Sequence, residues 1–318
     1  MKDVGQRSAE LAGLRHAAPY IRLFKGKTFV VKVGGAALEE EAAALELLGQ
    51  VEVLHQVGIR VVLVHGGGSE STALARSLGA EPRFVEGGRV TDAQALAVAA
   101  MVLNGTVNTR ILAACRRLGL PAAGVSGVDA GLVQARRRPP VQIGGQPVDY
   151  GFVGDVVSIK PGVLSTLLDA GFVPVVSPLS AADDGTLLNI NADTVASALA
   201  VGLRAEKLIL MTGAPGILER PGDSGSLVSY VDLAGLRRLR EQGCLIEGML
   251  PKASAIESAV RGGVARVHIL AAGPPDNLLA EVFTNEGVGT MVVENIGALT
   301  AAEQAAGVSP AAQVEALL

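Results

Sequence analysis

Two stretches decide the fold: Thr28–Gly35 reads TFVVKVGG, and Val61–Gly68 reads VVLVHGGG. Each is a short apolar run rich in β-branched residues that ends on glycines, which is typical of a buried strand followed by a turn. Between them, Glu39–Val57 repeats its apolar residues at helical spacing and stops at Gly58. The order strand, helix, strand predicts a parallel, right-handed α/β arrangement.

The same alternation continues along the chain. Further strands are expected at Val173–Ser177, Lys207–Met211 and Arg266–Leu270, and further helices at Asp92–Leu118, Asp193–Leu203 and Ala253–Val260. Val141–Val153, with Gly144 and Gly145 at its centre, is expected to form a β-hairpin at the edge. With 40 Gly, no Trp and 3% aromatic residues, the core must be built from Ala, Val, Leu and Ile. We therefore predict an α/β protein with a mostly parallel central sheet covered by helices.

Two polar stretches rich in turn-forming residues, Ser177–Leu188 and Glu219–Ser226, interrupt this alternation. We place a boundary between an N-terminal and a C-terminal lobe near Ser180. The tail from Ile296 to Leu318 is rich in Ala with weak helical periodicity, so we expect a short terminal helix or a disordered end.

Charge and length exclude several classes of function. Among 318 residues, 27 Lys and Arg stand against 31 Asp and Glu, a formal net charge of −4, so no basic field exists to attract nucleic acid. No apolar run approaches the ~20 residues of a membrane span, and the start, MKDVGQRSAELAGLRH, lacks the apolar segment of an export signal. Cys115 and Cys244 fit neither a disulfide framework nor a structural zinc site. We expect a cytoplasmic protein that binds no membrane, nucleic acid or structural metal.

The glycines after the two strands are candidates for binding an anion. Gly34 and Gly35 follow Lys32, and three glycines follow His65. Glycines at the carboxyl end of a parallel strand let a ligand approach the backbone, whose N–H groups can hold phosphate oxygens. Because such strand ends meet at one edge of a sheet, we expect both glycine loops at one site. His65 itself is expected to cap or pack rather than to react.

Three later segments place polar groups beside helix starts. Arg89, in GRVTD, could hold a carboxylate through two hydrogen bonds, while Asp92 caps the next helix. In NINAD, residues 189–193, capping explains one of three polar side chains, which leaves two for a ligand or a turn. Lys252 lies at a helix start, where the helix dipole disfavours a positive charge unless an anion is near. Its position therefore indicates a bound phosphate.

From about Tyr20 to Val292, the chain resembles a known family. Seven motifs carry this resemblance: KVGG, VHGGG, GRVTD, YGFVGDV, LLNINADTVA, GMLPK and GVGTM. It resembles the amino acid kinase superfamily and, within it, the arginine-sensitive acetylglutamate kinases. There is no G-x-x-x-x-G-K-[ST] sequence, so a P-loop mechanism is excluded on pattern. The resemblance implies a three-layer αβα sandwich with two lobes, residues 28–180 for acetylglutamate and residues 181–295 for ATP.

The resemblance also implies a reaction and its residues. The γ-phosphoryl group of ATP, with Mg²⁺, would pass to the side-chain carboxylate of N-acetyl-L-glutamate, giving N-acetyl-L-glutamyl 5-phosphate and ADP in arginine biosynthesis. Lys32 and Lys252 would be catalytic, with Asp193 holding them in place. The substrate would bind to Gly67, Gly68, Arg89 and Asn189. The nucleotide and its phosphates would bind to Gly34, Gly35, Thr212, Gly213, Gly216, Gly248 and Met249.

Residues 1–27 carry a further implication of the resemblance. Leu14–Lys27 looks like the N-terminal helix that joins dimers of this family into a ring-shaped hexamer, a trimer of dimers. We therefore expect a hexamer and inhibition by arginine, with the arginine site at Tyr20, His268, Glu281 and Gly287.

The sequence departs from the family pattern at four places. Ser69-Glu70-Ser71 follows the triple glycine where Pro and then an apolar residue are usual, and Gly88 replaces a Leu before the arginine. Gly213 stands where the family has Asp, which puts a carboxylate on the nucleotide side in doubt. LAAG, residues 270–273, replaces a segment bearing Asp-Gly-Arg and weakens the inference of an arginine site.

Two other hypotheses for the function stay open. One is the sister kinase of lysine biosynthesis, which phosphorylates aminoadipate attached to an acidic carrier protein and which needs a basic rim at the acyl entrance. Arg136–Arg138, otherwise a solvated loop, is the only candidate for that rim. The other is a protein that binds nucleotide or amino acid but has lost turnover, for which Gly213 is the best support. A carbamate or aspartate kinase fits poorly, because GRVTD and NINAD together look like the acetylglutamate pattern.

Overall fold

The computed structural model describes residues 4–245, 248–284 and 287–298 of the chain. Its centre is an eight-stranded sheet in the order β14-β16-β15-β13-β1-β2-β10-β5. The strands are β1 (Thr28–Val33), β2 (Arg60–His65), β5 (Ala122–Ser126), β10 (Val173–Ser177), β13 (Lys207–Thr212), β14 (Tyr230–Asp232), β15 (Arg266–Ala271) and β16 (Thr290–Val293). All five strands predicted from the sequence are present, with ends that differ by at most one residue.

Neighbouring strands are parallel from β5 across the sheet to β15. Only β16 pairs with its neighbour β15 in the antiparallel sense, and β14 then runs parallel to β16. The predicted mostly parallel sheet is therefore confirmed, and the carboxyl ends of β1, β2 and β13 lie side by side at one edge.

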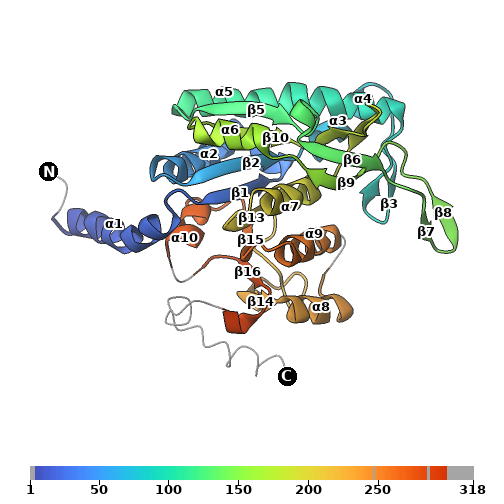
Figure 1. Ribbon diagram of the computed structural model, residues 1–318. Helices are drawn as coiled ribbons and strands as arrows, with labels where there is room; N and C mark the ends of the chain where they lie inside the picture. Colours follow the sequence, from blue (N-terminus) through green and yellow to red (C-terminus); the bar gives the residue numbers. More distant parts are fainter. Residues whose placement is uncertain (1–3, 246–247, 285–286, 299–318) are drawn as a thin grey trace.

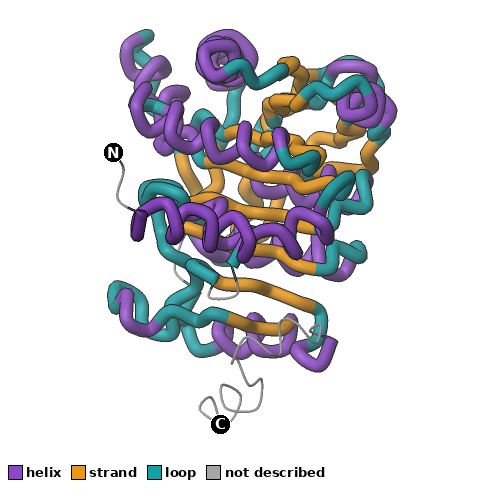
Figure 2. The backbone as a smooth tube through the Cα atoms, turned by 90° about the vertical axis from the view of Figure 1, so that its left-hand side faces the viewer, coloured by secondary structure: helices purple, strands orange, loops and turns teal. Residues whose placement is uncertain are grey.

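Helices cover both faces of this sheet (Figures 1 and 2). The core on one face contains Val30, Val62 and Leu208. It is closed by α6 (Gly162–Asp169), α7 (Ala192–Gly202), α8 (Leu233–Glu241) and α9 (Met249–Arg261). The core on the other face contains Val31, Leu63 and Ile209. It is closed by α2 (Glu41–Gln56), α3 (Gly68–Ser77), α4 (Ala93–Ala100), α5 (Asn108–Leu118) and α10 (Asn277–Phe283).

The alternation of side chains along a strand explains these two cores. Even positions of β1 face α7 and α9, and odd positions face α2. The result is the three-layer αβα sandwich that the family resemblance implies. The same alternation decides where the polar side chains at the strand ends point.

Smaller strands complete the fold. A four-stranded sheet has the order β12-β11-β6-β9, and two hairpins pair β3 with β4 and β7 with β8. These strands are β3 (Phe84–Val85), β4 (Gly88–Arg89), β6 (Val133–Arg137), β7 (Val141–Ile143), β8 (Gln146–Val148), β9 (Gly154–Ile159), β11 (Leu179–Ala181) and β12 (Leu187–Asn189). Short 3-10 turns are η1 (Gly35–Leu38), η3 (Asp129–Gly131), η4 (Ser224–Ser226) and η5 (Ile296–Ala298).

The predicted hairpin over Val141–Val153 is confirmed at its tip and shorter than expected. β7 and β8 project from the body of the protein (Figure 1), joined by Gly144 and Gly145 with φ angles of 57° and 81°. The chain then turns back, and Val153 forms an isolated bridge with Asn189. This return brings the YGFVGDV segment to the edge where the glycine loops lie.

The predicted helix Asp92–Leu118 is confirmed in extent but is not regular. The Asp92 carboxylate caps it by accepting the N–H of Ala95 at 2.8 Å, as predicted, and Gly119 ends it with a φ angle of 76°. Between α4 and α5, residues Met101–Val107 form a π-helical segment, labelled η2. A wide turn of this kind changes which face the following residues present.

By length and composition alone, Ala93–Leu118 is apolar enough to span a membrane, contrary to the expectation that no apolar run is long enough. Its α5 part packs against α2, β5 and β10 and buries Ile111 and Cys115 in the core. It thus has the packing of a helix that covers a sheet.

The N-terminal helix α1 (Val4–Phe24) begins earlier than the predicted Leu14 and ends before Lys27. Figure 1 shows it projecting from the body beside α10, and its end is anchored by Phe24, whose ring meets Phe29 edge-on at 5.2 Å between centroids. Leu14 and Leu23 on this helix are 62% exposed each. At the other end of the chain, the predicted tail beyond Ala298 lies outside the described residues.

Candidate functional site

Two lysines and one carboxylate meet at the carboxyl edge of the sheet. Lys32 is the even-numbered residue near the end of β1, so its side chain points to the face covered by α7 and α9. The Lys32 Nζ lies 2.9 Å from Asp193 Oδ1 on α7, and the Lys252 Nζ on α9 lies 2.8 Å from Asp193 Oδ2. The three predicted catalytic residues, although 220 positions apart at their extremes, form one cluster.

This cluster is buried and carries more positive than negative charge. Lys32, Asp193 and Lys252 are only 9%, 7% and 7% exposed. Burial alone would raise the pKa of Asp193, but the charges of the two lysines outweigh it and lower that pKa. Burial lowers the pKa of Lys252, against the attraction of Asp193. With one carboxylate between two ammonium groups, the cluster is suited to an additional anion.

At the start of α7, the three polar side chains of the NINAD segment have different partners. The Asn191 side chain is the helix cap, since its Oδ1 accepts the N–H of Asp193 at 2.8 Å and of Thr194 at 3.2 Å. The Asn189 amide instead donates to the hydroxyl of buried Thr91 at 3.3 Å. Because Asn191 is the cap, the carboxylate of Asp193 is free to bind the two lysines.

One argument from the sequence was wrong in its detail. We predicted that Lys252, at a helix start, needs a bound phosphate to offset the helix dipole. In the structure α9 begins at Met249, one turn before Lys252, and the anion that faces its ammonium group is Asp193.

The two glycine loops touch each other, as expected from adjacent strand ends. A Cβ at Gly35 would lie 3.1 Å from Gly67 Cα, and one at Gly66 would lie 3.3 Å from the Gly35 N. On its other side, a Cβ at Gly67 would come within 2.9 Å of Leu103 in η2. A side chain at these positions would crowd the neighbouring loop or Leu103, so the backbones themselves form this part of the site.

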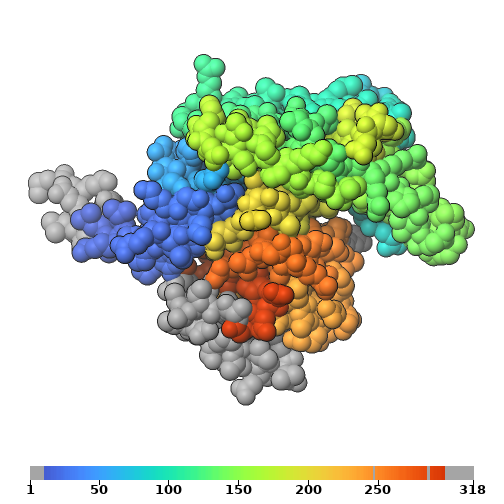
Figure 3. All heavy atoms as spheres, in the orientation of Figure 1, coloured from blue at the N-terminus to red at the C-terminus, as the bar shows by residue number. Residues whose placement is uncertain are grey.

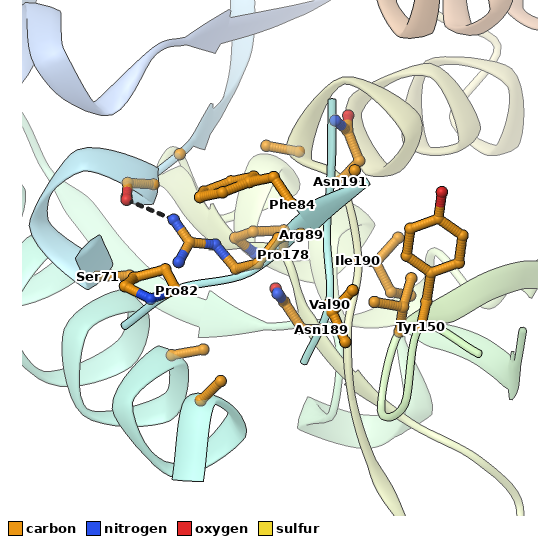
Figure 4. Close-up of a pocket in the computed structure, with 18 of the residues that line it drawn as sticks. Ser71, Pro82, Phe84, Arg89, Val90, Tyr150, Pro178, Asn189, Ile190 and Asn191 are labelled. Carbon is orange, nitrogen blue, oxygen red and sulfur yellow. Dashed lines mark hydrogen bonds between the residues drawn. The ribbon is translucent and has the colours of Figure 1, made fainter. Parts of the chain in front are cut away.

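A cavity of about 650 Å³ opens beside the cluster. Its lining includes Lys32, Gly66, Gly67, Gly68, Ser71, Phe84, Arg89, Arg138, Tyr150, Asn189, Asn191 and Asp193. Figure 4 shows Arg89 reaching it from β4, and Asn189 and Asn191 reaching it from one segment at the end of β12. All four predicted substrate residues therefore line one cavity, together with two of the catalytic three.

Arg89 is already partly engaged. Its Nη2 donates to the Gly68 carbonyl at 2.9 Å and to the Thr72 hydroxyl at 2.7 Å, and its guanidinium lies 4.7 Å from the centre of the Phe84 ring. In Figure 4 the Phe84 ring lies beside it. These contacts fix the arginine at the wall, where its remaining N–H groups can meet a carboxylate.

A second cavity adjoins this one between the β3–β4 hairpin and α9, lined by Phe84, Glu86, Gly87, Arg240, Leu250, Pro251 and Ser254. In the space-filling view the surface is hollowed between the part coloured green and the part coloured orange (Figure 3). The candidate site thus opens to solvent between two regions of the chain that are far apart in sequence.

Sequence reasoning missed several lining residues. The prediction that Arg136–Arg138 forms a solvated loop was wrong in two ways: Arg136 and Arg137 are exposed but belong to a strand, and Arg138 is only partly exposed. Arg138 pairs with Asp155 at 2.8 Å and lies 5.8 Å from the centre of the Tyr150 ring. Arg136 and Arg137 end strand β6. Tyr150 and Asp155 both belong to the YGFVGDV motif, which was the one available signal that these residues are functional. No local pattern in the sequence predicts which strand packs beside this motif.

The predicted nucleotide residues lie at the same edge but outside this cavity. Thr212 ends β13, next to β1, and its hydroxyl accepts the Ala214 N–H at 2.9 Å in a tight turn. Gly213 faces open space, whereas a Cβ at Gly216 would collide with Thr290 Oγ1 at 2.5 Å. Gly248 is the cap residue of α9 and Met249 begins that helix. The nucleotide assignment stays a prediction.

The structure also brings together three of the four predicted arginine-site residues. The Glu281 carboxylate on α10 accepts from His268 Nδ1 at 2.5 Å and from the Val288 N–H at 2.7 Å, next to the turn at Gly287. Burial alone would raise the pKa of Glu281, but the hydrogen bond and charge of His268 and the Val288 N–H lower it to about 2. Burial lowers the pKa of His268. The fourth residue, Tyr20, lies on α1 and packs against the core that contains Val31, Leu63 and Ile209.

With this geometry in place, comparison with known proteins gives a consistent result. The amino acid kinase family matches residues 27–271. An acetylglutamate kinase of Myxococcus xanthus is 47% identical over 288 residues, covering 89% of this chain and 94% of that protein. One of Symbiobacterium thermophilum is 45% identical over 284 residues, covering 89% of this chain and 97% of that protein.

Solved structures agree on the fold. N-acetylglutamate synthase of Neisseria gonorrhoeae, in complex with coenzyme A and N-acetyl-glutamate, superposes with a TM-score of 0.78 at 32% identity over 90% of this chain. The match spans 63% of that longer chain. The same synthase in complex with coenzyme A and L-arginine gives a TM-score of 0.78 at 31% identity, over 90% of this chain and 65% of the synthase.

The cluster geometry makes a prediction about stability. Asp193→Asn keeps the size of the side chain but leaves two buried ammonium groups without their carboxylate, so we expect the free energy of unfolding to fall by about 3–5 kcal/mol. The control is Asp155→Asn, whose carboxylate is 33% exposed in its pair with Arg138, and which should cost about 1 kcal/mol or less. Urea unfolding of both variants measures the difference, and equal losses would contradict the assigned geometry.

Proposed function

The chain belongs to the amino acid kinase family, and from this premise we propose that it phosphorylates N-acetyl-L-glutamate with ATP as an acetylglutamate kinase of arginine biosynthesis. The observation that carries the proposal is the Lys32–Asp193–Lys252 cluster, which leaves excess positive charge at the glycine-lined edge of the sheet. The 41–47% identity to curated acetylglutamate kinases over most of the chain supports the choice of substrate.

The reaction needs no covalent attachment to the protein. A side-chain carboxylate oxygen of N-acetyl-L-glutamate attacks the γ-phosphorus of ATP, while the bond from that phosphorus to the bridging oxygen breaks and its electron pair leaves with ADP. The product is an acyl phosphate. Catalysis of such a transfer consists of positioning and of neutralising charge on the phosphoryl oxygens. Lys32 and Lys252 would approach these oxygens from two sides, held in place by Asp193.

The cavity walls supply the positioning. Gly67 and Gly68, with Gly34 and Gly35, would donate backbone N–H groups to phosphoryl and substrate oxygens. Arg89 would hold the carboxylate that does not react, and Asn189 would bind the acetylated end. ATP would lie on the side of Thr212 and Gly248, within residues 181–295, and acetylglutamate on the side of residues 28–180.

Mg²⁺ would accompany the nucleotide. No group of three or more His, Cys, Asp or Glu side chains within residues 4–298 that the structure describes is placed to hold a metal. A Mg²⁺ ion that accompanies a nucleotide is commonly bound by phosphate oxygens and water, and the ion would neutralise phosphate charge during transfer.

The alternative of a carrier-linked aminoadipate kinase loses support from the arginine contacts. Arg137 pairs with Asp149 at 2.8 Å and Arg138 with Asp155 at 2.8 Å. These pairs neutralise the segment that would have to form a basic rim, so an acidic carrier protein finds little complementary charge there. The alternative of a protein without turnover is still supported by Gly213, which stands where the family has Asp. Against it, a protein that only binds its ligands does not need the two buried lysines Lys32 and Lys252.

The decisive experiment is ADP release from ATP and Mg²⁺ with each of four acceptors: N-acetylglutamate, aminoadipate, glutamate and aspartate. We expect turnover with N-acetylglutamate alone, and trapping with hydroxylamine should give the hydroxamate of an acyl phosphate. Lys32→Ala should lower kcat by about 100- to 1000-fold, because one stabilising charge at the transition state is removed. Lys27→Ala, on an exposed lysine just before the same strand, is the matched control and should change kcat little. Nucleotide binding without ADP release would favour the non-catalytic reading.

The pH profile should report Lys252. Deprotonation removes a positive charge from the transition state, so kcat/KM for ATP should fall as pH rises. Because burial lowers the pKa of Lys252, the fall should be centred below the ordinary lysine value of about 10.4. Lys252→Arg, whose guanidinium keeps its charge, should move the fall to higher pH even if its rate is lower. A profile that is flat up to pH 10.5 in the unmodified protein would contradict this role.

We also propose that the protein is a cytoplasmic hexamer, a trimer of dimers, that arginine inhibits. The support is the exposed apolar side of α1, with Leu14 and Leu23, and the neighbouring cluster of His268, Glu281 and Gly287. The buried Glu281 carboxylate, whose pKa is low, lies on α10, the helix that α1 contacts, and a carboxylate of this kind is suited to a guanidinium group. Residues 270–273 (LAAG), where the family has a segment bearing Asp-Gly-Arg, lack the polar side chains of that segment.

Deleting residues 1–25 tests both parts at once. Without α1 the expected assembly is a dimer, and arginine inhibition should be lost because Tyr20 is removed with the helix. Light scattering with size-exclusion chromatography measures the mass, and ADP release with increasing arginine measures the inhibition. A truncated chain that still forms a hexamer would rule out α1 as the joint.

A further inference from the structure

His65 is buried next to the site but outside the cavity. It ends β2 at an odd position, so its ring points to the α2 and α5 face, away from Lys32, and it is 0% exposed. Its Nδ1 lies 3.0 Å from the carbonyl oxygen of Gly66, and its Nε2 lies 3.0 Å from Asn108 Nδ2 at the start of α5. Neither contact is explained by the phosphoryl-transfer roles assigned above.

The hydrogen-bond partners of Asn108 fix the proton on the His65 ring. Asn108 Nδ2 also lies 3.0 Å from the carbonyl oxygen of Val175 in β10. A carbonyl only accepts, so this Asn108 atom is the NH₂ group, with one hydrogen for Val175 and one for His65. His65 Nε2 must then accept, which places the proton of the neutral ring on Nδ1, where it donates to Gly66. Burial lowers the pKa of His65 and keeps the ring neutral.

This chain of hydrogen bonds orients one peptide group of the glycine loop. In a trans peptide the carbonyl of one residue and the N–H of the next point in opposite directions. When His65 holds the Gly66 carbonyl, the N–H of Gly67 is turned to the other side, where Gly67 lines the cavity. Within the described residues this N–H donates to no protein acceptor, so it is available to a ligand.

The π-helical segment η2 makes the arrangement possible. It places Asn108 against the sheet, and it packs Leu103 and Val107 against Gly67, with 2.9 Å and 3.4 Å to an ideal Cβ there. On β5, Gly124 leaves room for the amide, because a Cβ at Gly124 would lie 2.1 Å from Asn108 Oδ1. The segment therefore both confines Gly67 and carries the group that orients it.

We propose that His65 and Asn108 are positioning residues for phosphoryl transfer: the hydrogen bonds from Asn108 to His65 and from His65 to Gly66 hold the Gly67 N–H toward the transferring group. The inference rests on the proposed kinase function. It assigns a catalytic consequence to two residues that touch neither substrate nor the lysine cluster.

Kinetics of three variants test the proposal. His65→Leu removes both ring nitrogens, and kcat with ATP and N-acetylglutamate should fall by about 100-fold, as for loss of one preorganised donor, while both KM values change less than about threefold. His65→Asn keeps an N–H near the place of Nδ1, so it should recover at least about tenfold of that loss. Gly124→Ala displaces Asn108 from a distance and should lower kcat in the same way.

Gly49→Ala is the matched control for the glycine substitution, since a Cβ at Gly49 in α2 meets nothing within 4 Å. It should leave kcat unchanged. If His65→Leu does not fold, the kcat values of Gly124→Ala and His65→Asn still test the proposal. Folded His65→Leu and Gly124→Ala proteins with kcat within twofold of the parent would overturn the proposal, as would equal activity of His65→Leu and His65→Asn.

A spectroscopic measurement separates this inference from the kinase assignment. The ¹⁵N chemical shifts of the His65 imidazole in the unmodified protein should show a neutral ring protonated at Nδ1. A proton on Nε2 would overturn the proposal whatever the activity. If the parent releases no ADP with any acceptor, the kinase assignment fails, and with it the catalytic consequence of the Nδ1 proton, while the ring assignment is still decided by the spectrum.

Discussion

The whole site depends on one carboxylate shared by two ammonium groups. Asp193 draws Lys32 from the central strand β1 and Lys252 from helix α9 to within 2.9 and 2.8 Å of its two oxygens. At such depth like charges repel strongly, and neither lysine would hold its position without the acid between them. The packing of α7 on α9 and on β1 brings these three side chains together.

The surrounding fold follows from that requirement. Asp193 can bind the lysines because Asn191 caps α7 in its place, and Lys32 reaches it because even positions of β1 face that helix. Because side chains also alternate along β2, His65 at the end of that strand points to the opposite layer, where it contacts Asn108. One edge of the sheet therefore carries a charged cluster on one face and a neutral hydrogen-bonded chain on the other, with the glycine loops between them.

Much of this could be predicted from the sequence because strand ends and glycines are local signals. The runs at Thr28–Val33 and Lys207–Met211 gave strands to within a residue, and the order of strands and helices gave the parallel sheet. The π-helical segment Met101–Val107 could not be foreseen, since Asn104-Gly105-Thr106 weakens a helix locally but does not indicate whether the helix ends there or widens. Arg138 was misjudged because its partner Asp155 comes from another strand. The partner that stabilises Lys252 is likewise distant, 59 positions away.

The alternation along β1 and β2 restricts how these strands can change during evolution. Replacing Val30 or Val31 by another apolar residue alters only a local fit, which cores accommodate at modest cost. Inserting or deleting one residue is different, because it would exchange the two faces for everything downstream in the strand. Lys32 would then point toward α2, and His65 in β2 would point toward α7. Length changes in homologous chains should therefore collect in the β7–β8 hairpin and in other outlying loops, while the distance in sequence from each strand start to its glycines stays constant.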